Sequence, residues 1–272
     1  MPDTPIDRFA ELNAPASWQV VDFISDLHLQ ASEPETFAAF SHYLKVPPQG
    51  PADALFILGD LFEVWVGDDV LDPGAPSTDE HDFQRACAAA LRAHSLRKPV
   101  FFMHGNRDFL LGQPALQASG MQALPDPTVL LFRGERWLLS HGDALCLDDT
   151  DYMQFRAQVR QASWQREFLA QPLARREAVA RELREQSEAR KRRTGNDPSL
   201  WADLDPDAAR DWLQHAQAHA LVHGHTHRPA EHALGDGLRR VVLSDWDAGA
   251  TPPRAEVLRL NAQGLHRLPV LA

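Results

Sequence analysis

The sequence predicts an α/β fold with a helical segment inserted near residue 150. Three observations predict it. Apolar runs such as 54–58 and 99–103 are short and continuous, as in strands buried on both faces. Helical patterns follow these runs in the first half of the chain. Between residues 148 and 219 strand signals vanish and helical spacing dominates.

The first half of the chain is expected to alternate strands and helices. Apolar runs bounded by Gly and Pro indicate the strands, and a Pro in its first turn marks the start of the first helix. In order, we expect a strand at 18–25, a helix at 33–46, a strand at 54–58, a helix at 79–96, a strand at 99–103, and two strands joined by a turn at 128–132 and 136–140. Residues 1–17 are expected to be a frayed extension.

The segment 148–219 is expected to form a helical cap on a core made of residues 18–147 and 220–272. Between residues 155 and 193 there are eleven Lys and Arg against five Glu, a net charge of +6, whereas the remainder of the chain carries −17. A basic insert on an acidic body indicates a cap that meets phosphate or an anionic membrane surface. The alternative is a solvated helix with ion pairs four residues apart.

The rest of the insert and the end of the chain follow the same patterns. Within the insert we expect helices that begin at residues 149, 172 and 205, the last of them marked by an Asp cap and a Pro. Closing strands are expected at 239–243, 255–260 and 265–270.

Composition excludes several classes of protein. The chain has 272 residues with 44% apolar content, enough to bury a real core. Its net charge of −11 argues against nucleic acid as a partner. Two cysteines imply no disulfide framework, so a reducing cytoplasm is the expected location. The N-terminus lacks signal-peptide features, and no apolar run approaches the ~20 residues that span a bilayer.

Three histidines in five residues stand at 223–227, directly after the apolar run 220–222. On an extended segment, residues two apart point the same way. His225 and His227 can therefore face one point, and so can His223. Neutral imidazoles aimed at one point are typical metal ligands. The alternative is a surface histidine cluster.

Residues of the types that bind metals also follow other apolar strands. Together with the histidine run, the candidates are Asp26, His28, Asp60, Asn106, His141, His225 and His227. Open α/β sheets place ligands at the carboxyl ends of their strands, which is where these residues fall. Taken singly, Asp60 is also compatible with a capping role and His141 with a structural one. His104 is expected to lie behind the site or in the core.

The chemistry of this set indicates the kind of centre. It mixes carboxylate and amide oxygens with imidazole nitrogens and contains no thiolate, which suits Mn²⁺, Fe²⁺ or Zn²⁺ rather than a structural zinc site. Seven groups are too many for one ion and suit two, with Asp60 as the expected bridge. Two ions roughly 3.5–4 Å apart can clamp a phosphoryl group during an in-line displacement.

The blocks D-x-H, G-D, G-N-x-D, H-G-D and G-H-T-H, in this order, resemble the calcineurin-like metallophosphoesterases. Within that family the chain is similar to the branch that hydrolyses UDP-2,3-diacylglucosamine in the lipid A biosynthesis of Gram-negative bacteria. The similarity covers about residues 18–247, and its motifs lie at 25–29, 58–63, 65–69, 104–112, 141–143 and 223–229. Most of the superfamily has a His where this chain has Arg107. That Arg, followed by F-L-L-G, is the most specific signal.

The resemblance implies a fold and a centre. The fold would be a four-layer α+β sandwich, two mixed sheets flanked by helices, with an inserted helical cap. The centre would hold two Mn²⁺ ions. Asp26, His28, Asp60 and His227 would bind one ion, and Asp60, Asn106, His141 and His225 would bind the other.

The resemblance also implies a reaction. A metal-bridging hydroxide would attack the α-phosphorus of UDP-2,3-diacylglucosamine and release UMP and 2,3-diacylglucosamine 1-phosphate, lipid X. Arg107 would stabilise the growing charge, an electrostatic role, with Asp60 and Asn106 as the other catalytic residues. Contacts to substrate would come from Asn106, Arg107, Asp149, Ser187 and His225.

The cap would hold the acyl chains, and the protein would be a peripheral protein on the cytoplasmic face of the inner membrane, with a monomer favoured. Two polar positions of the family's insert fall on Lys191 and Thr194 and do not match. The basic run 190–193 is expected either to replace those contacts or to meet the anionic bilayer surface.

Two other functions compete with this one. The first is a metallophosphoesterase that acts on a soluble nucleotide or phosphoester, which would need no apolar groove. The second is a binding module on a degenerate scaffold, which should have lost ligands. All seven candidate ligands are present.

Overall fold

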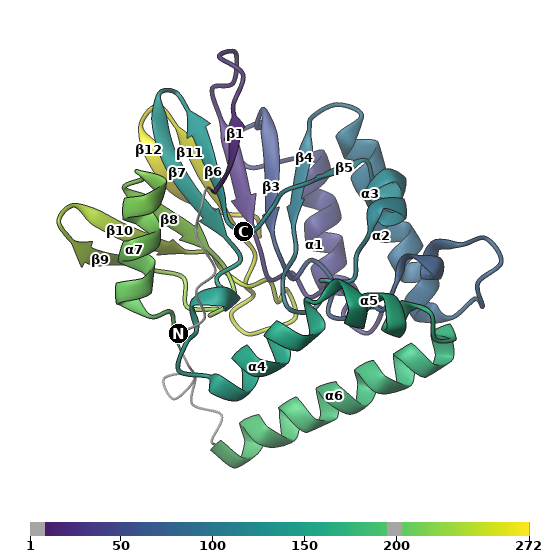
Figure 1. Cartoon of the computed structure of the whole chain (residues 1–272). Coiled ribbons are helices and arrows are strands. Elements are labelled where there is room, and N and C mark those ends of the chain that lie inside the picture. The colour runs from purple at the N-terminus through teal and green to yellow at the C-terminus, as the bar shows by residue number, and fades with distance from the viewer. Residues whose placement is uncertain (1–8, 195–202, 272) are drawn as a thin grey trace.

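A computed structural model of the chain describes residues 9–194 and 203–271, and from 186 to 194 only the backbone. Two six-stranded sheets pack face to face between outer helices (Figure 1). In spatial order the first sheet is β12 (Gly264–Pro269), β11 (Glu256–Asn261), β2 (Val21–Ile24), β3 (Ala54–Leu58), β4 (Val100–Met103) and β5 (Met121–Ala123). The second is β1 (Ala10–Asn13), β6 (Thr128–Phe132), β7 (Glu135–Ser140), β8 (Ala220–His223), β10 (Leu238–Val242) and β9 (Glu231–Gly235).

Both sheets mix parallel and antiparallel pairs. Strands β2, β3, β4 and β5 run parallel, while β11 pairs antiparallel with β2. In the second sheet β7, β8 and β10 run parallel and β9 closes the edge in the opposite direction. The predicted four-layer sandwich of two mixed sheets is therefore confirmed.

The two faces of each strand explain why the apolar runs are continuous. Phe23 and Phe56 point between the sheets and pack with Trp137 of the second sheet. Their neighbours Ile24 and Ile57 point the other way, toward the outer helices. Successive side chains of a strand alternate between its faces, so a strand covered on both sides needs apolar residues at every position.

Helices cover the outer faces. On the first sheet lie α1 (Pro34–Lys45), α2 (Asp79–Ser95) and α3 (Gln113–Ser119). On the second lies α7 (Pro206–Ala216), whose Ala209 and Leu213 are fully buried against Val129 and Leu138. The cap was predicted to run to residue 219, yet α7 falls in that range and packs on the sheet. The cap boundaries otherwise stay a prediction.

Three helices lie together along one end of the sandwich in Figure 1: α4 (Thr150–Val159), α5 (Ala162–Leu169) and α6 (Leu173–Thr194). Buried Arg176 ties α6 to the core, because its Nη1 donates to the Val66 carbonyl at 2.6 Å and its Nη2 pairs with Asp69. One residue further on, Glu177 accepts from His81 of α2 at 2.7 Å. Both ties hold the N-terminal end of α6.

Several elements differ from the expectation. Residues 10–13, expected in a frayed extension, form β1 and pair in parallel with β6. Helices α3 and α5 and the edge strands β5 and β9 were not expected. Among the helices described, none is long and apolar enough to cross a membrane.

Candidate metal centre

The seven candidate ligands gather at one end of the sandwich. Asp26 and His28 follow β2, Asp60 follows β3, and Asn106 follows β4. From the second sheet, His141 follows β7, and His225 and His227 follow β8. The carboxyl ends of five strands thus deliver all seven side chains to one place, as the sequence predicted.

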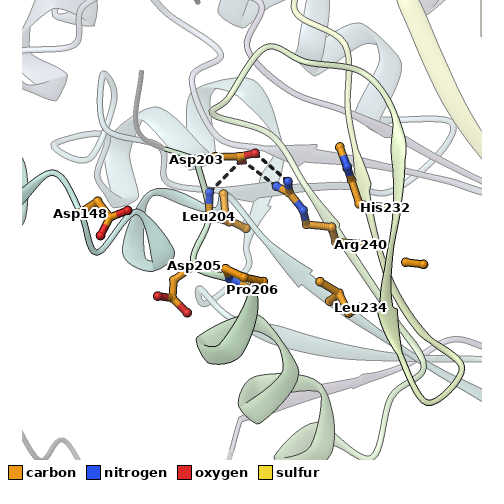
Figure 2. A pocket seen from close by; sticks show the side chains of 9 residues that line it. Asp148, Asp203, Leu204, Asp205, Pro206, His232, Leu234 and Arg240 are labelled. Carbon is orange, nitrogen blue, oxygen red and sulfur yellow. Dashed lines mark hydrogen bonds and ion pairs between the residues drawn. The ribbon is translucent and has the colours of Figure 1, made fainter. Parts of the chain in front are cut away.

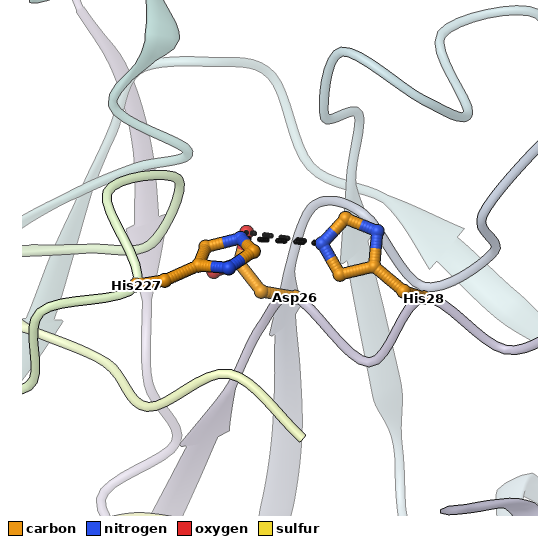
Figure 3. Close-up of side chains that lie close together, drawn as sticks. All are labelled: Asp26, His28 and His227. Carbon is orange, nitrogen blue, oxygen red and sulfur yellow. Dashed lines mark hydrogen bonds and ion pairs between the residues drawn. The ribbon is translucent and has the colours of Figure 1, made fainter. Parts of the chain in front are cut away.

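One group consists of Asp26, His28 and His227, whose ligand atoms lie within 4.8 Å of one another. The Nε2 atoms of the two histidines are 3.2 Å apart, and Nε2 of His227 lies 3.3 Å from Oδ1 of Asp26. Figure 3 shows the two rings turned toward each other with the Asp26 carboxylate beside His227. Three donor atoms therefore converge on one point between both sheets.

The second group surrounds Asn106. Its Oδ1 lies 3.1 Å from Nε2 of His141 and 2.9 Å from Nδ1 of His225. Asp60 stands between the two groups, with Oδ1 3.7 Å from Nε2 of His141 and Oδ2 3.8 Å from Nε2 of His28. Asp60 thus faces both groups, and its role as a bridge stays a prediction. The assignment of each ligand to one ion stays a prediction.

Five of the seven candidates have a left-handed backbone. The φ angles of Asp26, His28, Asp60, His225 and His227 lie between 48° and 69°. Such conformations are uncommon for residues other than glycine, cost of order 1–3 kcal/mol each, and persist where the surroundings enforce them. Here backbone hydrogen bonds enforce them, for example from the Asp26 N–H to the Gly59 carbonyl at 3.1 Å.

Gly59, directly before Asp60, permits the close approach of three loops. Its φ is +88°, and a Cβ at this position would lie 2.7 Å from the Cα of Gly105 and would overlap Nδ1 of His141. No other residue fits there without displacement of a candidate ligand.

The carboxylates of the site favour positive charge at its centre. Burial alone would lower the pKa of His141, but Asp60, Asp143 and Asp26 outweigh it and raise that pKa to about 9. Burial alone would raise the pKa of Asp26, yet the nearby histidines hold it well below its usual range. A buried cluster that stabilises cations and offers oxygen and imidazole donors fits divalent metal ions.

Hydrogen bonds to Nδ1 of two histidine rings determine that the other nitrogen, Nε2, faces the metal centre. Nδ1 of His28 donates to Oε2 of Glu63 at 2.8 Å, and Nδ1 of His141 donates to the Leu58 carbonyl at 2.9 Å. Such contacts leave Nε2 of each ring free to bind a cation. Glu63 was not among the predicted site residues. Its signal in the sequence was its place at the end of the motif at 58–63, three positions after Asp60.

Asp143 joins helix α4 to the centre. This buried carboxylate accepts from Oη of Tyr152 at 2.6 Å and from Nε of Arg156 at 2.8 Å. The Tyr152 ring stacks on His225 with centroids 5.9 Å apart. In the sequence, Asp143 belongs to a motif but has no assigned role. The fold shows that it anchors α4 by accepting hydrogen bonds from two residues of that helix.

Two histidines lie outside both groups. Nδ1 of His223 donates to the Gly224 carbonyl at 2.8 Å, and burial lowers its pKa to about 3, so this ring is neutral. The expectation that His223 also faces the common point is wrong, since among the described residues it joins neither group. Nε2 of His104 lies 2.7 Å from the Leu111 carbonyl, in the supporting position expected for it.

The structure describes the side chains of only some of the residues predicted to contact the substrate. Arg107 lies at the rim, its Nη1 3.5 Å from Oε1 of Glu63. Asp149 caps α4, because its Oδ1 accepts from the Tyr152 N–H at 3.2 Å. The side chains of Ser187, Lys191 and Thr194 lie outside the described residues.

A separate hollow lies at the start of α7. Figure 2 shows Asp203 and Arg240 facing each other in it. Nη1 and Nη2 of Arg240 each donate to one carboxylate oxygen of Asp203 at 2.7 Å. None of the seven candidate ligands lines this hollow.

The sequence profile of the calcineurin-like phosphoesterases matches residues 20–229, well over half of the chain. The chain belongs to the calcineurin-like phosphoesterase family. The match begins just before β2 and ends two residues after His227, so it includes every candidate ligand. As a calcineurin-like phosphoesterase, the chain is a metal-dependent hydrolase, in agreement with the donor set.

Several members of the family are similar over nearly their whole length. A protein of Chromobacterium violaceum named UDP-2,3-diacylglucosamine hydrolase is 45% identical over 92% of this chain and 98% of its own. Proteins of the same name from Xanthomonas oryzae pv. oryzae and Stenotrophomonas maltophilia are 43% and 44% identical, over 89% of this chain and 96% and 95% of theirs.

Proposed function

We propose that the protein hydrolyses the pyrophosphate bond of UDP-2,3-diacylglucosamine in lipid A biosynthesis, giving UMP and 2,3-diacylglucosamine 1-phosphate. The observation that carries the proposal is 43–45% identity to hydrolases of that name across about 90% of the chain. The complete set of seven ligand-type residues at one end of the sandwich supports it.

We further propose that the site holds two Mn²⁺ ions. Asp26, His28, Asp60 and His227 would hold one, and Asp60, Asn106, His141 and His225 the other. The distances within the two groups support this division, with Asp60 facing both. Ligand atoms of Asp26, Asp60 and His141 also lie within 4.8 Å of one another, so the two proposed ion positions are adjacent. When bound, such ions supply Lewis-acid charge neutralisation and an activated water nucleophile for attack at the α-phosphorus.

The residues of the chain itself would bind and orient the diphosphate. The backbone N–H of Arg107 donates to Oδ1 of Asp60 at 2.9 Å and holds that carboxylate in place. The Arg107 side chain is 24% exposed at the rim, where its planar fork can bind phosphate oxygens and stabilise the charge they gain in the transition state. Asn106, the residue before it, and His225, whose Nδ1 lies 2.9 Å from Oδ1 of Asn106, are further proposed substrate contacts, and Asp149 and Ser187 are proposed sugar contacts.

The cap, proposed at residues 148–219 less helix α7, would take the acyl chains. Trp164 and Phe168 of α5 stack with centroids 4.9 Å apart, and Leu169 and Leu183 are 40% and 39% exposed. Exposed leucines beside a basic helix suit a lipid at an anionic bilayer surface. We therefore propose that the protein is peripheral on the cytoplasmic face of the inner membrane, and we favour a monomer as its working form.

The test is UMP release with added Mn²⁺ from UDP-2,3-diacylglucosamine, beside UDP-N-acetylglucosamine as the control without acyl chains. We expect UMP from the diacyl substrate alone, abolished by Asp60→Ala and reduced about 10²-fold or more by Arg107→Ala. Equal release from both substrates would contradict the role of the acyl chains. No release from either by the metal-loaded protein would overturn the proposed reaction and leave a soluble phosphoester as the substrate class to test.

A further inference from the structure

Glu63 contacts both the metal centre, through His28, and helix α6, through Arg184. It lies in the loop after β3. In this loop Phe62 forms an isolated parallel β-bridge with Leu29, and the Glu63 N–H donates to the Leu29 carbonyl at 3.2 Å. Its side chain is only 11% exposed. A carboxylate held this far from water needs charged or hydrogen-bonding partners, because burial of an unpaired charge is strongly unfavourable.

The two oxygens of Glu63 serve different parts of the molecule. Oε2 accepts from Nδ1 of His28 at 2.8 Å. Oε1 lies 3.5 Å from Nη1 of Arg107 and also 3.5 Å from Nε of Arg184, which belongs to helix α6. One buried carboxylate is thus the common partner of a ligand-type histidine, of Arg107 and of Arg184 on α6.

We propose that Glu63 is a positioning residue that couples two events. One is cation binding at the metal centre, and the other is the packing of α6 against that centre through Arg184; each stabilises the other. This inference rests on the proposed metal centre and is independent of the proposed lipid substrate. It also assigns Arg184 as the residue by which α6 responds to the centre.

The coupling follows from the chemistry of the shared carboxylate. When Nε2 of His28 binds a cation, the ring becomes a stronger donor at Nδ1 and holds the Glu63 carboxylate more firmly. A fixed carboxylate is a fixed partner for Arg184, whose Nη1 also donates to Oε1 of Gln30 at 3.3 Å. By thermodynamic linkage, an α6 held in place must in turn strengthen cation binding by the same factor.

The other described ties of α6 are suitable controls. Glu177 accepts from His81 and holds the N-terminal end of the same helix, and neither of these residues contacts a candidate ligand. Glu177→Gln therefore weakens the attachment of α6 without a change at the centre. Arg184→Gln removes the ion pair between Glu63 and the helix, together with the hydrogen bond from Arg184 to Gln30. Glu63→Gln keeps the shape of the side chain and removes its charge.

The experiment is amide hydrogen exchange of the full chain, metal-free and with saturating Mn²⁺, together with calorimetric titration of Mn²⁺. In the parent protein, Mn²⁺ should slow exchange at the α6 amides around Arg184. Both Arg184→Gln and Glu63→Gln should abolish that slowing, whereas Glu177→Gln should speed exchange but keep the response to Mn²⁺. Arg184→Gln should weaken Mn²⁺ binding about two- to fivefold, as expected for a partly exposed ion pair. Glu63→Gln should weaken it about 10–100-fold.

Kinetics with the lipid substrate give an independent check: Arg184→Gln should mainly raise KM, and Glu63→Gln should also lower kcat. The proposal is overturned if Mn²⁺ binds without any change in α6 exchange, or if α6 responds equally in Arg184→Gln. It is also overturned if Glu63→Gln alone alters Mn²⁺ affinity, since Glu63 would then only orient His28. Exchange and calorimetry use no substrate, so a wrong substrate assignment would leave these results unchanged.

Discussion

Replacement of Gly59 by alanine tests the account of how the loops of the metal centre are held together. The residue has φ +88°, and its missing side chain leaves room for the Cα of Gly105 and for Nδ1 of His141. Gly134, in the turn between β6 and β7, has φ +83° but nothing within 4 Å of an added Cβ. The two glycines share a backbone conformation and differ in their surroundings, so Gly134→Ala is a matched control.

The magnitudes follow from this difference. A left-handed backbone costs a residue with a Cβ about 1–2 kcal/mol, and both variants incur it. Gly59→Ala adds an overlap with backbone that cannot move freely, and forced overpacking costs about 1–3 kcal/mol more. We expect Gly134→Ala to lose about 1–2 kcal/mol of unfolding free energy and Gly59→Ala about 2–5 kcal/mol. Since the overlap falls on His141, Gly59→Ala should also lose Mn²⁺ affinity.

Urea unfolding of the two variants, with Mn²⁺ titration of each, measures both effects. Unfolding free energies extrapolated to water give the stability difference, and the slope against urea shows whether the comparison stays two-state. Equal losses for the two variants, with Mn²⁺ binding intact in Gly59→Ala, would refute the argument that this position allows only glycine.

Three further predictions concern the charges of the protein. Asp22→Ala leaves Arg259, bonded to it at 2.7 and 2.8 Å, as an unpaired buried cation, and should cost about 3–5 kcal/mol in urea unfolding without a change in Mn²⁺ affinity. Chelation should lower the Tm, and Mn²⁺ at 100 times its Kd should restore about 2.7 kcal/mol of unfolding free energy for each ion bound, an effect that Asp60→Asn abolishes. Burial alone would raise the pKa of Asp203, yet its pairing with Arg240 lowers it to about 2. The resulting stabilisation should be full above the ordinary Asp pKa of about 3.9 and fade as pH falls toward 2, so the urea midpoints of the parent and Asp203→Asn should differ at pH 5 and converge near pH 2.

The candidate ligands were predictable from sequence because two simple rules apply to them. Buried strands appear as continuous apolar runs, and the carboxyl ends of such strands meet at one edge. The residues after 54–58 and 99–103 were therefore expected at the same edge, and they lie close together because β3 and β4 are neighbours. The same reasoning does not cover His225 and His227, which follow β8 of the second sheet. Their backbone is not extended, and they lie in different groups rather than facing one point.

Contacts between distant parts of the chain had no comparable signal. Asp22 and Arg259 are 237 residues apart, and each alone is an ordinary charged residue in a strand. Strand β1 is only four residues long and half-buried, so its pattern does not distinguish it from an extension until β6 lies beside it. His223 shares the spacing of the ligands, but its ring is directed by the local carbonyl of Gly224. Glu63 acquires a role only when His28 and Arg184 meet it.

The most direct test of the proposed reaction is hydrolysis of UDP-2,3-diacylglucosamine in ¹⁸O-labelled water with Mn²⁺, followed by mass analysis of both products. Attack at the α-phosphorus places one ¹⁸O in UMP and none in 2,3-diacylglucosamine 1-phosphate, and this is the result we predict. Label in the lipid phosphate would contradict attack at the α-phosphorus. Absence of both products from the Mn²⁺-loaded protein would contradict the reaction itself.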